Sequence, residues 1–303
     1  MPEAFRSPDR SRSGSRLSPR SGQRLKVGAA LGKELTVLGV IDRRDGNPLC
    51  IVWHHLSWCP MACKTFETFR SAEREANVLA QFAHPNTVRF LGLSKPANLL
   101  MEFLEGPTLE QLIYKKAGRQ LRISDAIRVA IHIGAALEHI HQKGYLHLDI
   151  KPSNVIVARG GRPVLYDFGS ARLRNATRPS LVTGTDPYIA PEECLRESVT
   201  PAADIFGLGV TLYEMLTGEL PFPHGSRKQA FPQTSTEAVP IRKHRPTIPS
   251  RLGDLVHSCL QRDPAARPIL TSLLPALNEE IRTGARMWPS GFSPGHKGLR
   301  IIG

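Results

Sequence analysis

The chain has 303 residues, of which 41% are hydrophobic and 22% charged, and its formal net charge is +13. This length can bury the core of one large domain or of two packed lobes, with room for tails. No apolar run reaches the ~18 to 20 residues of a membrane helix, and the five cysteines lack the spacing of a disulfide framework. Composition therefore argues against a membrane span and a disulfide-stapled domain, and it predicts a cytoplasmic protein.

The two ends of the chain differ from its centre. Residues 1–24 are rich in Ser, Arg and Pro and have little to bury, which predicts a disordered basic arm. A basic arm can bind nucleic acid, but the chain lacks the mixture of aromatic and basic residues that supports single-strand binding. Nucleic acid is therefore not a favoured partner. Residues 283–303 are predicted to form a loosely ordered tail, which leaves 25–282 as the folded domain.

The first part of this domain has the pattern of a β-sheet with one helix. Segments rich in β-branched and apolar residues, bounded by turn-forming residues, predict strands at 35–41, 49–56, 61–66, 87–93 and 98–104. The intervening segment 69–82 is predicted to be a helix, because Ala72, Ala76 and Leu79 fall on one face.

Helical patterns dominate from residue 108 onward. The segments 124–144 and 204–218 are predicted to be helices, and each finishes in a glycine, as helix C-termini commonly do. A β-rich part followed by a helical part predicts an α+β fold with a small N-lobe at about 25–104 and a larger C-lobe at about 105–282. The cleft between two such lobes is a common ligand site.

The strongest motif is His147-Leu148-Asp149-Ile150-Lys151-Pro152-Ser153-Asn154, followed by Asp167-Phe168-Gly169. Here the chain resembles the eukaryotic-like Ser/Thr protein kinase family. The resemblance implies that Asp149 orients the substrate hydroxyl and accepts its proton, and that Asn154 and Asp167 hold Mg²⁺, with Mn²⁺ as an alternative. Lys151 is spaced to reach the transferred phosphate, and Lys151 together with Thr185 resembles the Ser/Thr branch of the family. The implied substrates are ATP and a protein with Ser or Thr hydroxyls.

Further segments follow in the order that the family has. Met61-Ala62-Cys63-Lys64 resembles the strand whose lysine binds ATP phosphates, and Glu75 matches the helix glutamate that pairs with this lysine. Asp204 matches a buried aspartate that braces the catalytic loop, and Arg267 matches an arginine that pairs with Glu192; these three look structural. The resemblance assigns the remaining nucleotide-site positions to Ala62, Met101, Glu102, Leu104, Ile156 and Gly46.

Two departures from the family qualify this prediction. The glycine-rich loop that usually covers the phosphates is missing, because RRDGNP at 43–48 contains only Gly46. Arg43 or Arg44 could contact phosphate in its place. Leu148 replaces the arginine that usually binds a phosphate on the activation loop, so we expect activity to depend little on phosphorylation of that loop.

Three alternatives remain beside an active protein kinase. A pseudokinase that binds partners without transfer would explain the missing loop, and Mg·ATP turnover separates the two. A small-molecule kinase is disfavoured, because Gly184-Thr185-Asp186-Pro187-Tyr188-Ile189-Ala190-Pro191-Glu192 resembles the peptide-docking segment of protein kinases. A zinc site at His54, His55, Cys59 and Cys63 is disfavoured by its spacing, and adjacent strand residues point to opposite faces. The sequence leaves the oligomeric state open.

Overall fold

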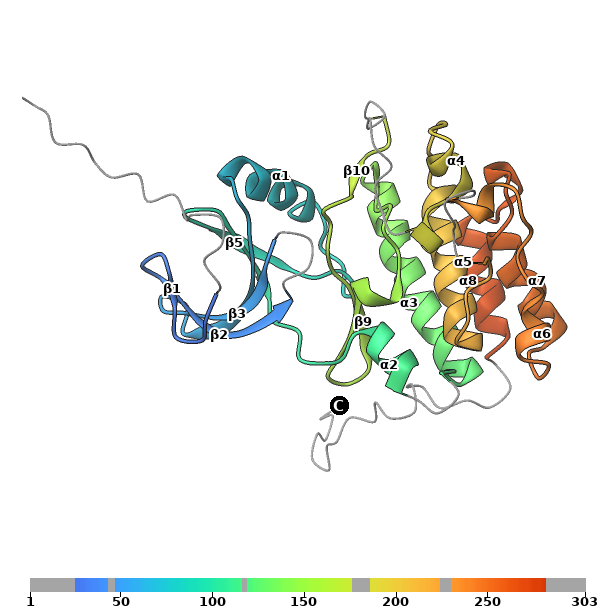
Figure 1. Cartoon of the computed structure of the whole chain (residues 1–303), viewed down its shortest axis with the longest axis horizontal. Coiled ribbons are helices and arrows are strands. Elements are labelled where there is room, and N and C mark those ends of the chain that lie inside the picture. Colours follow the sequence, from blue (N-terminus) through green and yellow to red (C-terminus); the bar gives the residue numbers. More distant parts are fainter. Residues whose placement is uncertain (1–24, 43–46, 116–118, 176–185, 224–229, 282–303) are drawn as a thin grey trace, which may run out of the picture.

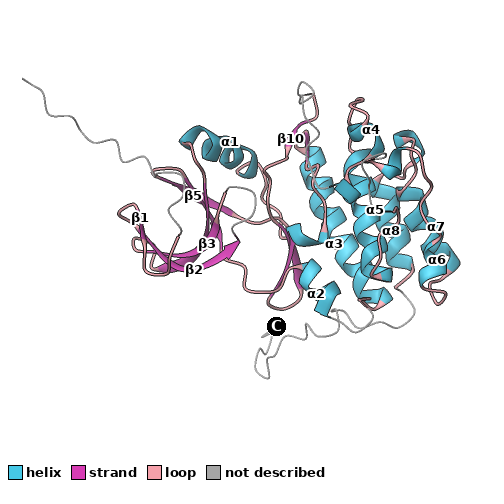
Figure 2. Ribbon diagram, in the orientation of Figure 1, coloured by secondary structure: helices cyan, strands magenta, loops and turns pink. Residues whose placement is uncertain are grey.

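The computed structural model describes residues 25–42, 47–115, 119–175, 186–223 and 230–281. Within these ranges the chain folds into two lobes (Figure 1). Strands gather in the N-terminal lobe and helices fill the C-terminal one (Figure 2). This is the α+β, two-lobed architecture that the sequence predicted. Gly46 and Thr185 are not among these ranges, so the roles predicted for them lie outside the described residues.

The N-lobe is built on an antiparallel sheet that has six strands in the described residues, in the order β1-β2-β3-β4-β6-β5. The strands are β1 (Ala30–Leu31), β2 (Leu35–Asp42), β3 (Leu49–His54), β4 (Cys59–Thr65), β5 (Phe90–Ser94) and β6 (Asn98–Glu102). Successive side chains of a strand point to opposite faces. On β4, Cys63 therefore packs with Cys50 and Val52 in a small apolar cluster on one face, while Lys64 is turned to the other.

One helix, α1 (Phe69–Leu79), packs against this sheet. Its N-cap is Thr68, whose side chain accepts a hydrogen bond from the Ser71 backbone N–H and so satisfies one free donor of the first turn. The buried face carries Ala72, Ala76 and Leu79, as predicted, and also Glu75. The helical spacing thus places a carboxylate on the apolar side, where it needs a partner.

The C-lobe contains the helices α2 (Leu109–Lys115), α3 (Ile123–Gln142), α4 (Pro191–Cys194), α5 (Ala202–Thr217), α6 (Ile241–His244), α7 (Ser250–Cys259) and α8 (Leu270–Glu279). At its centre lies α5, in which every residue from Ala203 to Thr217 is buried. A helix that is mostly apolar on every side is stable inside a core, and here α3 and α7 pack against α5. No helix of the described part is both long and apolar enough to cross a membrane.

Two short antiparallel strand pairs flank the C-lobe loops that face the N-lobe. Strand β7 (Tyr145–Leu146) pairs with β10 (Arg172–Leu173), and β8 (Val155–Ala158) pairs with β9 (Arg162–Leu165). The loop 147–154 therefore begins at β7 and returns through β8, while the segment 166–171 joins β9 to β10. Their strand pairing holds these two loops next to each other at the face of the C-lobe that meets the N-lobe (Figure 1).

Several predicted boundaries were wrong by a few residues. The helix predicted over 69–82 ends at Leu79, because Gln81 and Phe82 donate to carbonyls three residues back, which tightens the last turn. Strand β3 stops at His54, so His55 lies in the turn and the argument that placed both histidines on a strand does not hold. Strand β5 begins only at Phe90, and α5 begins two residues before Asp204.

Candidate active site

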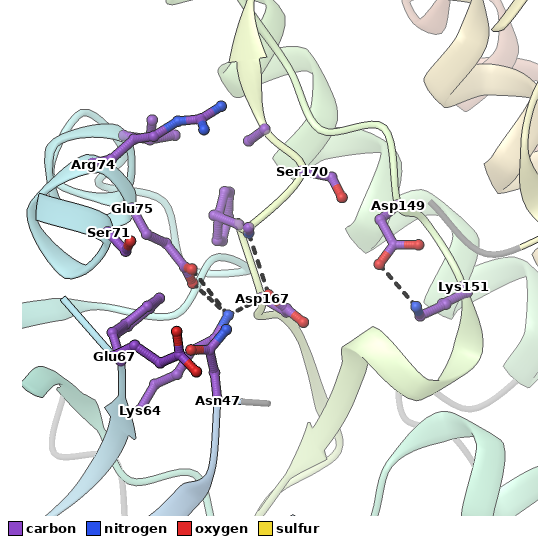
Figure 3. Close-up of a pocket in the computed structure, with 15 residues that line it drawn as sticks. Asn47, Lys64, Glu67, Ser71, Arg74, Glu75, Asp149, Lys151, Asp167 and Ser170 are labelled. Atoms are coloured by element: carbon purple, nitrogen blue, oxygen red, sulfur yellow. Dashed lines mark hydrogen bonds and ion pairs between the residues drawn. The ribbon is translucent and has the colours of Figure 1, made fainter. Parts of the chain in front are cut away.

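A cavity of about 650 Å³ lies between the two lobes. The N-lobe contributes Lys64 and Glu75 to its wall, and the C-lobe contributes Asp149, Lys151 and Asp167. Figure 3 shows these side chains around the cavity, with Asp149 and Lys151 on the far side from Lys64. Five polar residues that the sequence assigned to the site therefore surround one space.

Lys64 is the centre of the N-lobe side of this cavity. Its Nζ lies 2.9 Å from both carboxylate oxygens of Glu75 and 2.9 Å from Oδ1 of Asp167. Burial alone would lower the pKa of Lys64, but the charges of Asp167 and Glu75 outweigh it and raise that pKa. Burial likewise opposes ionisation of Asp167, yet the charge of Lys64 lowers the pKa of Asp167 overall. The ion pair predicted between Lys64 and Glu75 is thus present, and it extends to Asp167.

Asp167 has an unusual backbone conformation, with φ = 62°. A non-glycine residue in this region costs on the order of 1–3 kcal/mol, so its surroundings must hold it there. Its Oδ1 accepts the Gly169 N–H at 3.2 Å as well as the bond from Lys64. The next side chain, Phe168, is buried against the rings of Phe82 and His147. The buried ring and the two bonds fix the Asp167 carboxylate at the cavity.

The loop 147–154 presents a second cluster. Lys151 Nζ donates to Oδ2 of Asp149 at 2.8 Å, and Asn154 Nδ2 donates to the same oxygen at 2.7 Å and to the Asp149 carbonyl at 2.9 Å. Because its amide nitrogen is used in this way, Asn154 keeps its Oδ1 without a hydrogen bond inside the described residues. The Asp149 carboxylate is thereby oriented, and an amide oxygen is left beside it.

Asp204, which is 1% exposed, fixes the start of this loop. Its carboxylate accepts the backbone N–H of His147 at 2.9 Å and that of Leu148 at 2.7 Å, and it lies 2.8 Å from Nε2 of His141. Burial opposes its ionisation, but the hydrogen bond and charge of His141 outweigh burial and lower the pKa of Asp204. Leu148 has φ = 63°, and these bonds hold it there. The predicted bracing contact is present.

A buried ion pair joins α4 to the segment before α8. Arg267 makes two bonds of 2.8 Å to the carboxylate oxygens of Glu192, and its remaining N–H groups donate to the carbonyls of Gln261, Ala202 and Arg262. Both side chains are almost fully buried. The pair predicted from the sequence is present, and all of its contacts are structural.

The other described residues that the resemblance assigned to the nucleotide site lie close together on β4, β6, β8 and the segment after β6. Ala62 pairs directly with Met101 across β4 and β6, and Met61 pairs with Glu102. Ala62, Met101, Leu104 and the half-buried Ile156 belong to one hydrophobic cluster. None of these residues lines the cavity of Figure 3, which covers the charged end of the site. Their part in binding the nucleotide stays a prediction.

Comparison with known proteins gives the family. The protein kinase domain family matches residues 53–276. The chain belongs to the protein kinase family. It is 35% identical over 209 residues to serine/threonine-protein kinase PkaA of Streptomyces coelicolor, covering 66% of this chain and 38% of that protein. It is 32% identical over 213 residues to PknA of Mycobacterium tuberculosis, with 66% and 48% covered. It is 30% identical over 208 residues to PrkC of Bacillus subtilis, with 66% and 32% covered.

These relatives are serine/threonine-protein kinases by name, and the match with this chain spans 32% to 48% of their length. The match covers both lobes from β3 to α8, and thus every described residue of the two charged clusters. The eukaryotic-like Ser/Thr type that the motifs predicted is therefore confirmed at the level of the family.

The motifs did not indicate five polar residues that line the kinase cavity: Asn47, Glu67, Ser71, Arg74 and Ser170. Asn47 could have been found from its place two residues before the strand residue opposite Lys64. Ser71 and Arg74 reach the cavity only because α1 lies beside it, and Ser170 lies in the segment between β9 and β10. The residues of the zinc alternative are engaged separately, since His54 bonds Ser57 and His55 bonds Thr36. In the described ranges no three His, Cys, Asp or Glu side chains gather to hold a metal.

Proposed function

We propose that this chain transfers the γ-phosphoryl group of ATP to Ser or Thr hydroxyls of protein substrates. The observation that carries the proposal is the convergence of two charged clusters on one cavity. Lys64, paired with Glu75 and Asp167, lies on one side, and Asp149 with its partner Lys151 lies on the other. Phosphoryl transfer needs this combination, because its catalysis is mostly positioning and neutralisation of charge.

The roles follow from the contacts. Lys64 carries a positive charge toward the space where ATP phosphates would lie, and Glu75 keeps its ammonium in place. Asp149 accepts the proton of the substrate hydroxyl as that oxygen bonds to the γ-phosphorus, and the bond to the β-γ bridging oxygen breaks to leave ADP. Lys151, held by Asp149 at 2.8 Å, offers its charge to the transferring group. The proposed setting is the cytoplasm.

A magnesium ion fits the oxygen atoms present here. Mg²⁺ is usually held by one or two carboxylates together with substrate phosphates. Asp167 Oδ2 and Asn154 Oδ1 accept no hydrogen bond within the described residues, while the other polar atom of each side chain is engaged. When bound, the ion would neutralise charge on the phosphates, and Asp167 and Asn154 would hold it; Mn²⁺ has the same ligand preference.

A pseudokinase that binds partners without efficient transfer is the second candidate. One observation favours it: the segment before β3 lacks the glycines whose backbone N–H groups usually cradle phosphates. If phosphate binding were weak, the charged clusters would be present without supporting efficient phosphoryl transfer. An active kinase turns over Mg·ATP, whereas a pseudokinase does not do so efficiently.

The deciding experiment measures phosphate transfer from Mg·ATP to a generic basic protein. We expect Asp149→Asn to lower the rate by about 10²- to 10⁴-fold, the usual contribution of a general base, and Asp167→Ala to abolish most transfer. The matched control is Asp254→Asn, an exposed aspartate on α7. Wild-type transfer no faster than that of Asp149→Asn, with ATP binding intact, would establish the pseudokinase instead.

A further inference from the structure

Asn47 lies at the mouth of β3, and its half-buried side chain lines the cavity. Leu49, two residues later, is directly opposite Lys64 in the sheet. Residues two apart along an extended chain point to the same face of a sheet, so Asn47 is expected on the same face as Leu49 and Lys64. Figure 3 shows its amide turned toward the cavity on the side of Lys64, across from Asp149.

The backbone around Asn47 is anchored by its neighbour. The Pro48 carbonyl accepts the Thr65 backbone N–H at 3.0 Å and the Thr65 hydroxyl at 3.3 Å. The proline ring fixes its own φ and steers the preceding residue away from the helical region. The backbone next to Asn47 is thus fixed by the pairing of β3 with β4.

The chemistry of this position suits a phosphate. Pro48 has no backbone N–H to offer, so a cradle made of backbone donors is interrupted here. The Asn47 amide carries two N–H donors, and within the described residues it makes no hydrogen bond. Lys64, its cationic neighbour on the wall, is already shared between Glu75 and Asp167. A neutral donor next to that cluster can bind phosphate oxygens without disturbing the ion pairs.

We propose that the side-chain amide of Asn47 donates hydrogen bonds to the phosphate chain of ATP, in the place of backbone N–H groups of a glycine-rich loop. The inference rests on the proposed function only in so far as the cavity binds ATP. It names a binding residue outside the set that the motifs assign.

The test is direct calorimetric titration of the full chain with Mg·ATP and, separately, with adenosine, which lacks phosphates. We expect Asn47→Leu, which keeps the size but removes the donors, to raise Kd for Mg·ATP about tenfold, or ~1.4 kcal/mol. Asn47→Asp should raise it further, because a carboxylate repels phosphate. Adenosine should bind all three proteins equally, which also verifies their fold. The matched control is Asn77→Leu, an exposed position on α1.

Two results would overturn the inference and leave the proposed function standing. One is an Asn47→Leu protein whose Kd for Mg·ATP stays within about twofold of the wild type. The other is an equal loss for Mg·ATP and adenosine in both variants, which would mean that Asn47 shapes the pocket as a whole. A wild-type chain that binds adenosine but gains nothing from the phosphates would overturn both.

Discussion

Replacing Asp204 by Asn probes how the catalytic loop is held. The carboxylate accepts from three donors: the backbone N–H groups of His147 and Leu148, and Nε2 of His141. An asparagine keeps one acceptor oxygen, but its NH₂ group must face donors that the carboxylate satisfied. Of the three bonds, only one or two can then survive, and a buried N–H is left without a partner.

The magnitude follows from these contacts. Hydrogen bonds to charged groups contribute ~1.5–3 kcal/mol each, and breaking a buried ionic contact from one side costs about 3–5 kcal/mol. We therefore expect Asp204→Asn to lower the free energy of unfolding by about 3–5 kcal/mol. The variant should also lose activity at least about tenfold, because Leu148 at φ = 63° is released and Asp149 follows it in the chain.

Urea unfolding and initial transfer rates measure the two effects, with Asp254→Asn as the exposed control. The difference should depend on pH in a defined direction. The pKa of Asp204 is lowered by folding, so its stabilisation is complete above the unfolded value of ~3.9 and is lost as the pH falls through the folded value. The two proteins should converge in acid. An unfolding free energy within about 1 kcal/mol of the wild type at pH 7 would refute the bracing role.

Three further predictions concern residues away from the chemistry. Burial raises the pKa of Glu193 to about 8, so its stabilisation is full only below the unfolded value of ~4.3 and is lost as the pH rises from there through about 8; Glu193→Gln should melt no higher than the wild type at pH 4 and increasingly higher as the pH rises to 9. A Cβ on Gly106 would clash with the carbonyl oxygen of Val157 in β8. Gly106→Ala should therefore lower the free energy of unfolding by about 1–3 kcal/mol and weaken ATP binding, because β8 must shift. A melting temperature and a Kd for Mg·ATP equal to those of the wild type would contradict this. Arg267→Met should cost about 3–5 kcal/mol in urea unfolding, because Glu192 is left charged and buried, and adding Glu192→Gln should recover part of that loss.

Much of the architecture and most of the charged site could be predicted from the sequence. The residues of the segment from His147 to Asn154 and of the Asp167-Phe168-Gly169 motif are close together in the sequence. Each motif lies in one short loop between paired strands, so its residues are also close together in the structure. Alternating and helical periodicity likewise identified the strands and the long helices. Their ends were less predictable, because hydrogen bonds to neighbouring segments, such as the tightened turn after Leu79, decide where an element stops.

The sequence by itself determined which residues carry charge and in what order: Lys64, Glu75, Asp149, Asn154 and Asp167. Only the tertiary structure decided that Lys64 bonds Asp167, 103 residues away, and that Asn47 is turned toward the same cavity. It also decided that Leu148 adopts a left-handed backbone conformation under the hold of Asp204. Local spacing is fixed by covalent geometry, whereas contacts between distant segments arise only when strand register and core packing bring them together, and no local pattern records that.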